Sequence, residues 1–384
     1  MNYIVELGKD ANEHELVNSC ALYLWQEVFK YDTRFYGSHA HKNALLQLLP
    51  NLKIDAFEAI HILPRKNGNK LQWLKIYLHE IATVIRILRK AKRERVENIV
   101  FLSLSSPTMA FVKKYLKFNP IQAKLFFTLH GDLQWLIQDE LGGSERFFSS
   151  LIRRNLSNVC EGNYFVVYGK TIKDKLLTIF PELREHVLSL EHPFITKKEL
   201  VRRVSNIFTI GAFGVISRQK NSHQIIELAE LMHDKNPLMQ FRLVGKFIDH
   251  LPYKNEAITV IGGTEFLTRQ DYEKQIGDTA WLMYLYEDRN YELIASGAFL
   301  DAILYHKPII CLRNSFFQNV FKTYEIGILV DSIEELPEAL IKLFSRTDLL
   351  EFYAGCQVNI QRYSEDNDLE KQIDILKKHL KNIK

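Results

Sequence analysis

The sequence predicts an α/β protein built from two Rossmann-like, doubly wound parallel-sheet domains that face a cleft. Short apolar runs, typical of buried parallel strands, alternate with amphipathic helices through both halves of the chain. With 384 residues, the chain is long enough for two domains of ordinary size. A polar segment containing a proline, EHPFITKKELVRRVSN (191–206), separates the two halves.

In the first half, five apolar runs predict strands and four amphipathic segments predict helices. The strands are Tyr3–Leu7, Ala59–Leu63, Ile99–Leu104, Lys124–Leu129 and Tyr164–Tyr168. The helices cover about 12–29, 71–95, 107–117 and 147–157.

In the second half, the same alternation predicts six strands and five helices. The strands are Ile207–Ile210, Gln240–Val244, Ile258–Ile261, Trp281–Tyr286, Pro308–Leu312 and Gly327–Val330. The helices lie near 221–233, 269–276, 296–306, 315–321 and 333–345.

These elements divide the chain into three parts. We expect an N-terminal Rossmann-like domain at 1–198 and a second Rossmann-like domain at 199–347. The charged segment 348–384 is predicted to be helical and to return to the first domain.

Composition indicates an ordinary globular protein with an uneven distribution of charge. Residues 1–198 hold 28 Lys and Arg against 20 Asp and Glu, a net charge of +8, whereas the rest of the chain has a net charge of −4. A basic first half suggests an anionic partner.

No run approaches the length of a spanning helix, and MNYIVELGKD does not resemble a signal peptide. The four widely spaced cysteines favour reduced thiols, so we expect a cytoplasmic protein that at most touches a membrane.

The segment NIFTIGAFGVISRQKNSHQII predicts a strand, a glycine turn and a helix. Gly211 and Gly214 would let the backbone approach a ligand closely, and Arg218 and Lys220 could neutralise a diphosphate. The spacing fits neither a dinucleotide fingerprint nor a P-loop. The alternative interpretation is an ordinary turn with cations on the surface.

Residues 280–331 predict a strand, a loop, a helix and a strand of a parallel sheet. Ser296 and Gly297 would begin the helix, and the backbone N–H groups of Ser296, Gly297 and Ala298 would be free to bind a phosphate. Together with the glycine turn, this arrangement points to a nucleotide sugar or a similar diphosphate, because open α/β sheets bind ligands at the carboxyl ends of their strands.

Over residues 206–345 the chain resembles the GT-B glycosyltransferases, particularly the large retaining family of bacterial polysaccharide and lipopolysaccharide enzymes. GVISRQKN is similar to the Gly-Arg-Leu…Lys-Gly turn of that family, with Gly214 and Lys220 on matching positions. Val215 replaces the arginine, so Arg218 would supply the second cation. ELIASGAFLDAI is similar to a variant in which Ser-Gly replaces Gly-Phe-Gly.

DAILYHKPIICL resembles the helix and strand that follow the paired-glutamate motif of the family. Asp301 falls on the second acid, which the resemblance places against the ribose hydroxyls. The first glutamate falls on Leu293, and Glu292, one position away, is a possible substitute.

In the first half, KLFFTLHGDLQWL ends a strand with His130 and Asp132. His130 resembles the family's histidine near the donor sugar; a structural role is the alternative. Asp132 could instead cap the next turn. In an inverting enzyme either residue could be the general base, whereas in a retaining one His130 would hold the sugar. The resemblance implies no cofactor and no metal, and no Asp-x-Asp pair ends a strand.

The helix at 71–95 has two possible interpretations. Leu74, Leu78, Ile81, Ile85 and Leu88 form one stripe, and six basic residues crowd its carboxyl end. The helix could lie on an anionic membrane near a lipid-linked acceptor. Alternatively, it packs in the core and its cations complement the helix dipole.

The leading hypothesis is therefore a hexosyltransferase that uses a nucleoside-diphosphate sugar and modifies a glycan or lipid-linked acceptor in cell-surface polysaccharide synthesis. The resemblance implies that the domain at 1–198 binds the acceptor and that the domain at 199–347 binds the nucleotide sugar. The protein would be cytoplasmic, in peripheral contact with the inner face of the plasma membrane. The alternatives are a sugar-nucleotide 2-epimerase-like enzyme and a non-catalytic GT-B-fold binding subunit. No nucleic-acid motif is present.

Overall fold

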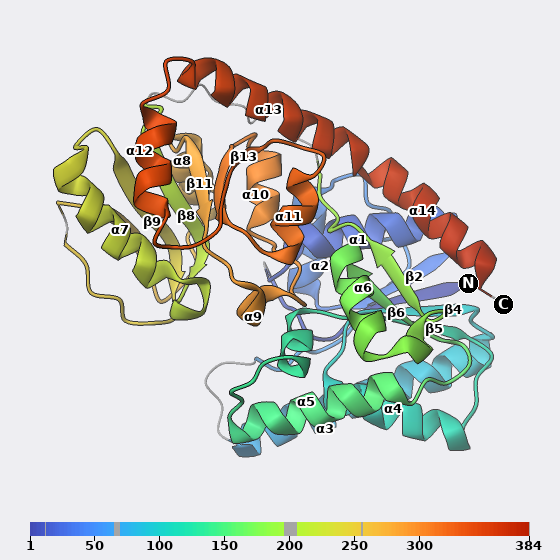
Figure 1. Cartoon of the computed structure of the whole chain (residues 1–384). Coiled ribbons are helices and arrows are strands. Elements are labelled where there is room, and N and C mark those ends of the chain that lie inside the picture. Colours follow the sequence, from blue (N-terminus) through green and yellow to red (C-terminus); the bar gives the residue numbers. More distant parts are fainter. Residues whose placement is uncertain (12, 65–69, 196–205, 255, 384) are drawn as a thin grey trace. The chain divides into compact units, whose positions relative to one another are not determined.

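A computed structural model describes residues 1–384 except 12, 65–69, 196–205, 255 and 384 (Figure 1). The chain forms two compact units. The first contains Met1–Ile195, Leu293–Ala295 and Asp368–Lys384, and the second contains Thr196–Glu292 and Ser296–Asn367. The boundary predicted near residue 198 lies outside the described residues.

The first unit is a seven-stranded parallel sheet in the order β3-β2-β1-β4-β5-β6-β7. Strands β1, β4 and β6 are almost wholly buried because helices cover both faces of such sheets. Its strands are β1 (Asn2–Glu6), β2 (Thr33–Gly37), β3 (Phe57–Ala59), β4 (Asn98–Ser103), β5 (Lys124–Thr128), β6 (Asn163–Tyr168) and β7 (Val187–Leu190). Its helices are α1 (Glu15–Val28), α2 (His39–Leu48), α3 (Lys70–Glu94), α4 (Ser106–Phe118), α5 (Gly143–Ser157) and α6 (Lys170–Ile179), with 3-10 turns at η1 (Gly131–Leu136) and η2 (Pro181–Leu183).

The second unit is a six-stranded parallel sheet in the order β10-β9-β8-β11-β12-β13. Its strands are β8 (Thr209–Ile216), β9 (Gln240–Phe247), β10 (Ile258–Gly263), β11 (Trp281–Tyr284), β12 (Ile309–Leu312) and β13 (Gly327–Val330). Its helices are α7 (Ser222–Lys235), α8 (Arg269–Gly277), α9 (Asp288–Tyr291), α10 (Phe299–Leu304), α11 (Ser315–Phe321), α12 (Leu336–Phe344) and α13 (Leu349–Asp366), with a 3-10 turn at η4 (Arg218–Lys220). The two sheets confirm the predicted α/β fold class.

The last helix, α14 (Leu369–Asn382), belongs to the first unit, whereas α13 belongs to the second. Ile373 and Leu376 of α14 are buried in a core cluster that also contains Trp25 and Leu188. The Gln372 side chain accepts a hydrogen bond of 3.0 Å from the N–H of Glu191, just beyond β7. The end of the chain therefore completes the core of the first unit.

In each sheet the strand order reverses at one point. The reversal lies between β1 and β4 in the first sheet and between β8 and β11 in the second. In open α/β sheets, ligands bind at such a reversal, at the carboxyl ends of the strands. The structure therefore marks one candidate binding edge in each unit.

Several element bounds differ from the sequence prediction. Strands β2 and β7 were not predicted, and the strand expected at Ala59–Leu63 is instead β3, Phe57–Ala59. β8 extends to Ile216, through both glycines that were expected to form a turn after Ile210. The helix expected from Ser296 begins at Phe299, and the Ser296 hydroxyl accepts from the Phe299 N–H just before it.

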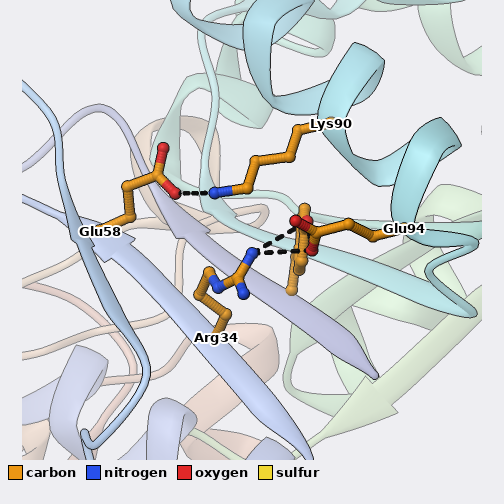
Figure 2. Close-up of polar contacts among 5 residues, drawn as sticks. Arg34, Glu58, Lys90 and Glu94 are labelled. Atoms are coloured by element: carbon orange, nitrogen blue, oxygen red, sulfur yellow. Dashed lines mark hydrogen bonds and ion pairs between the residues drawn. The ribbon is translucent and has the colours of Figure 1, made fainter.

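One face of α3 packs against the sheet through Ile76, Val84, Ile87, Leu88 and Ala91. Figure 2 shows the ion pairs that join the carboxyl half of α3 to strands β2 and β3. Arg34 of β2 lies 2.7 Å from the Glu94 carboxylate, and Lys90 pairs with Glu58 of β3. Of the predicted apolar stripe, Leu88 is buried, whereas Leu74 and Leu78 are 54% and 56% exposed. No helix in the described ranges is long and apolar enough to span a bilayer.

Candidate functional site

Gly214 lies near the carboxyl end of β8, at the candidate binding edge of the second sheet. Gly214 has a φ of +95°, and a Cβ atom there would meet no atom within 4 Å. Its carbonyl oxygen would lie 1.9 Å from a Cβ at Gly245 of β9, where φ is +144°. Both positions therefore require glycine, and the space above Gly214 is open to a ligand.

Lys220 ends the turn that follows β8. The Ser217 hydroxyl accepts from the Lys220 N–H at 3.3 Å, which fixes the turn in front of α7. The Lys220 ammonium lies 5.6 Å from the centroid of the Tyr286 ring, within cation–π range. Burial lowers the pKa of Lys220 to about 8, and the negative charge of Asp301 opposes that decrease. At the carboxyl ends of the strands of the second sheet, the Lys220 ammonium therefore lies close enough to the Asp301 carboxylate to be affected by its charge.

Asp301 projects from α10 and is only 9% exposed. Its carboxylate accepts a hydrogen bond of 2.5 Å from the Tyr272 hydroxyl of α8. Burial raises the pKa of Asp301 to about 6, although Tyr272, Arg269 and Lys220 all lower it. A buried carboxylate that feels the charge of two cations without an ion pair to either among the described residues is suited to accept hydrogen bonds from ligand hydroxyls.

The turn from Ser296 to Ala298 exposes two backbone donors. The Ser296 hydroxyl accepts from the Phe299 N–H at 3.2 Å, and the Ala298 carbonyl accepts from the Tyr284 hydroxyl at 2.7 Å. Among the described residues, no hydrogen bond is formed by the N–H groups of Gly297 and Ala298. Two unsatisfied N–H groups at the amino end of a helix are suited to an anion.

Two stacked tyrosine rings lie beside the turn from Ser296 to Ala298. The rings of Tyr286 and Tyr291 stack with centroids 4.3 Å apart. Burial raises the pKa of each phenol, and a hydrogen bond with Ser296 opposes the increase in both. An aromatic wall next to free amides and an ammonium group is suited to a ligand that carries both a ring and a phosphate.

The other predicted residues of this unit have different surroundings. Arg218 is exposed, and its backbone N–H donates to the Asp249 carboxylate at 2.6 Å. Glu292 is half-buried and directly follows α9, where its N–H donates to the Asp288 carbonyl. The second cation near Asp301 is instead Arg269, whose guanidinium donates to Tyr305 at 2.9 Å. No sequence signal singled out Arg269 or Tyr272, because both come from α8, about thirty positions before Asp301.

Replacing Asp301 with Asn should stabilise the free protein at pH 8. The folded pKa, about 6, is above the ordinary value of 3.8, so ionisation of Asp301 costs stability as the pH rises from about 4 to above 6. The variant avoids this cost, and we expect its free energy of unfolding at pH 8 to be about 1–3 kcal/mol higher. Denaturant unfolding at pH 4 and pH 8 measures the difference, with the exposed Asp234→Asn as control. A variant less stable than the parent at pH 8 would contradict this account.

In the first unit, His130 lies immediately after β5. Its Nε2 is 2.7 Å from the Leu102 carbonyl oxygen, which can only accept, so Nε2 carries the proton and Nδ1 is the acceptor. Asp132, in η1, accepts from the Ser106 hydroxyl at 3.2 Å. Burial raises the pKa of Asp132, and His130 opposes the increase. His130 can therefore accept a hydrogen bond from a ligand hydroxyl through Nδ1.

Two further histidines, which the sequence did not single out, lie near His130. The ring centroids of His14 and His130 are 5.7 Å apart. Burial lowers the pKa of His14 to about 2, and the charges of Lys9 and the neighbouring histidines add to the decrease. Burial also lowers the pKa of His192 to about 4, although a backbone hydrogen bond at Pro193 opposes the decrease. Both rings are neutral at physiological pH and are weak general bases. No group of potential metal ligands is found among the described residues.

The loop between β1 and α1, which carries His14, is held by a buried network at the β1–β4 reversal. The Glu6 carboxylate accepts from the N–H groups of Gly8 and Lys9 at 2.6 and 2.9 Å. Asn18 donates to the same carboxylate at 2.8 Å and contacts His41 Nε2 at 2.9 Å. Because His41 Nδ1 faces the Ala11 carbonyl at 2.8 Å, Nδ1 carries the proton and Nε2 accepts from Asn18.

Replacing Asn18 with Ala should loosen this loop. Asn18 is 2% exposed, and its loss leaves a Glu6 oxygen and His41 Nε2 without their donor. We expect a loss of about 1–3 kcal/mol in the free energy of unfolding, together with faster amide hydrogen exchange at Gly8 and Lys9. Asn119→Ala, at an exposed helix end, is the matched control. Unchanged exchange in the Asn18 variant would show that the network does not hold the loop.

The fold is shared with solved glycosyltransferases. Anabaena HepE, solved in complex with UDP-glucose, aligns over 99% of both chains with a TM-score of 0.65 and 13% identity. A glycosyltransferase from Rickettsia africae ESF-5 aligns over 100% of this chain and 99% of its own, with a TM-score of 0.59 and 12% identity. WaaG, a glycosyltransferase involved in lipopolysaccharide biosynthesis, aligns over 98% of both chains with a TM-score of 0.60 and 12% identity.

These similarities show that the chain has the GT-B fold, as the sequence resemblance predicted. No protein-family model matches the sequence, and no curated protein matches it. At 12–13% identity the fold alone is shown. The function must therefore be argued from the residues at the carboxyl ends of the strands in the two sheets.

Proposed function

We propose that this chain is a glycosyltransferase that transfers a sugar from a nucleoside-diphosphate sugar to a glycan or lipid-linked acceptor in cell-surface polysaccharide synthesis. The observation that carries the proposal is that Lys220 and the buried Asp301 follow the neighbouring strands β8 and β11 at the reversal of the second sheet, close enough for each charge to shift the pKa of the other. An ammonium group, free amides and a buried carboxylate match a diphosphate joined to a ribose.

Each predicted donor-site residue has a proposed part in binding. Lys220 and the N–H groups of Gly297 and Ala298 bind the diphosphate, with Ser296 shaping the turn. Asp301 accepts from the ribose hydroxyls, and Gly214 leaves room for the ligand. Arg218 and Glu292 are proposed as outer contacts, since Arg218 is exposed and Glu292 is half-buried.

The chemical step is displacement at the anomeric carbon of the donor sugar. The acceptor hydroxyl oxygen forms a bond to that carbon, the bond to the phosphate oxygen breaks, and the diphosphate leaves with the electron pair. The proton of the acceptor hydroxyl passes to His130 Nδ1 or to the leaving diphosphate. Lys220, with Arg269 nearby, supplies positive charge for the leaving group, so the proposal includes no metal. His130, supported by Asp132, is proposed to face the sugar or the acceptor hydroxyl through its Nδ1 acceptor.

The test is a thermal-shift panel of nucleoside diphosphates and their sugars. A ligand that binds only the folded state raises the melting temperature. UDP and UDP-glucose are tested first because HepE was solved with UDP-glucose. Product analysis then separates transfer to an acceptor from epimerisation of the donor. Absence of a shift with every nucleotide would reject the proposal.

One observation favours the second candidate, a non-catalytic binding subunit. The position matching the family's first glutamate is Leu293, which is 1% exposed in the core of the first unit. A protein that binds nucleotide sugars without turnover would support this candidate. A hexosyl product that forms only with an added acceptor supports the transferase.

A further inference from the structure

The amino-terminal half of α3 exposes an apolar surface. Leu71, Leu74 and Leu78 are 66%, 54% and 56% exposed. With 100° per residue, their spacing places all three on one side of the helix, opposite the buried residues Ile76 and Val84. Exposed leucines in a row on one helix face are unusual in a soluble protein unless the face binds something.

Aromatic side chains extend this surface to α5. The rings of Trp73 and Tyr77 stack with centroids 6.0 Å apart, and Tyr77 contacts Phe148 of α5 at the same separation. Phe147, next in sequence to Phe148, is 59% exposed. At 100° per residue Trp73 falls on the side of Ile76 and Val84, whereas Tyr77 lies on the flank next to Leu74. We define the α3 surface as Leu71, Leu74, Tyr77, Leu78 and Phe147. A Tyr ring beside exposed aliphatic groups is typical of a surface at the boundary between lipid and water.

The same side of α3 becomes basic toward its carboxyl end. Arg86, Arg89 and Arg93 are exposed and follow the leucines at helical spacing. The ion pairs in Figure 2 engage Lys90 and Glu94, which lie on the side of α3 that faces the sheet. None of the three arginines forms an ion pair within the described ranges. Their charges are therefore available to an anionic partner.

The amino end of α3 follows β3, so it lies toward the edge of the first sheet where the strands end. His130 directly follows β5 and is placed toward this same edge. An occupant of the α3 surface would thus lie on the side of the unit that carries the candidate acceptor residues. This relation connects the surface to the chemistry of the acceptor.

We infer that the α3 surface docks on an anionic phospholipid bilayer, with the leucines and aromatic rings in the headgroup region and the three arginines against the lipid phosphates. One helix face that carries both aliphatic groups and unpaired cations matches such an interface in shape and charge. The inference deepens the proposed function, on which it rests, because a lipid-linked acceptor is presented at a bilayer surface.

The test is sedimentation of the full chain with vesicles of phosphatidylcholine, with or without phosphatidylglycerol. Binding is expected with the anionic vesicles and should weaken as salt is added. Replacing Arg86, Arg89 and Arg93 with Ser should reduce the partition coefficient about 100-fold, at about fivefold per cation. Replacing Leu71, Leu74 and Leu78 with Ser should reduce it at least about tenfold.

The matched control is Leu350→Ser with Val358→Ser on α13, where the two side chains are 70% and 69% exposed in the second unit. Binding by this control should equal that of the parent. Absence of binding to anionic vesicles, or equal binding by the leucine variant, would overturn the inference. Light scattering that shows a dimer lost in the leucine variant would overturn it in favour of a second copy of the chain.

Nucleotide-induced thermal shifts, measured on the same proteins, separate the two proposals. A normal nucleotide shift in the leucine variant confirms that it is folded and that its loss of binding is local. Vesicle binding without any nucleotide shift would leave the surface in place and reject the transferase. A nucleotide shift without vesicle binding would reject the docking surface and leave the transferase proposal in place.

Discussion

Replacing Lys220 with Ala is expected to weaken the binding of a nucleoside diphosphate by about 10–100-fold. Charge-assisted hydrogen bonds to a phosphate contribute roughly 1.5–3 kcal/mol each, and Ala removes the ammonium that makes them. Isothermal titration of the parent and variant with UDP measures the loss. At a UDP concentration about tenfold above the Kd of the parent, the thermal shift of the variant should fall well below that of the parent.

The pH dependence of binding identifies the ammonium as the cause. Burial lowers the pKa of Lys220 to about 8 in the free protein, so the cation is progressively lost as the pH rises above 8. A bound diphosphate favours the charged form, so the affinity of the parent should fall between about pH 7.5 and 9.5. The Ala variant lacks the group and should show no such decrease.

Two other substitutions make this test specific. Lys235→Ala, at the exposed end of α7, removes a lysine remote from the turn and should leave binding unchanged. Arg218→Ala tests the cation chosen from the sequence, which is exposed and whose backbone N–H donates to the Asp249 carboxylate. A larger loss with Arg218→Ala than with Lys220→Ala would transfer the diphosphate contact from Lys220 to Arg218.

The sequence located the parts of the site that lie next to one another along the chain. Gly214 and Lys220 share one turn after a strand, and glycine and cation at such a turn are recognisable locally. Tyr272 and Arg269 reach Asp301 from another helix, α8, and only the packing of α8 beside α10 brings them there. Residues that meet through tertiary structure leave no local signal.

The fold was predictable where periodicity had a single interpretation. Long apolar runs such as Asn163–Tyr168 are strands because only a sheet covered on both faces buries every residue. The short β3 has only intermediate and exposed residues, so its pattern carried little signal. In α3, apolar residues occupy two sides of the helix, and periodicity alone cannot identify the side that is buried.

Replacing Leu293 with Glu, which restores the residue expected from the family motif, should destabilise the protein by about 3–5 kcal/mol. Leu293 is 1% exposed and packs in the core cluster that includes Leu133 and Leu136. Its N–H donates to the Gln134 side chain at 2.8 Å, which fixes the backbone in place. A carboxylate at this position would lose its hydration and gain no described cation as a partner, so it would unfold the surroundings or remain protonated.

Unfolding in denaturant between pH 5 and pH 8 distinguishes these outcomes. A buried Glu has a raised pKa, so the variant should lose further stability as the pH rises through that raised value, whereas the parent lacks this group. Leu293→Met keeps the volume and apolar character and should cost less than about 1.5 kcal/mol. If the Glu variant were as stable as the parent and bound UDP-glucose more tightly, the position would belong to the donor site. The burial of Leu293 instead implies that any donor sugar is held without the first glutamate of the motif.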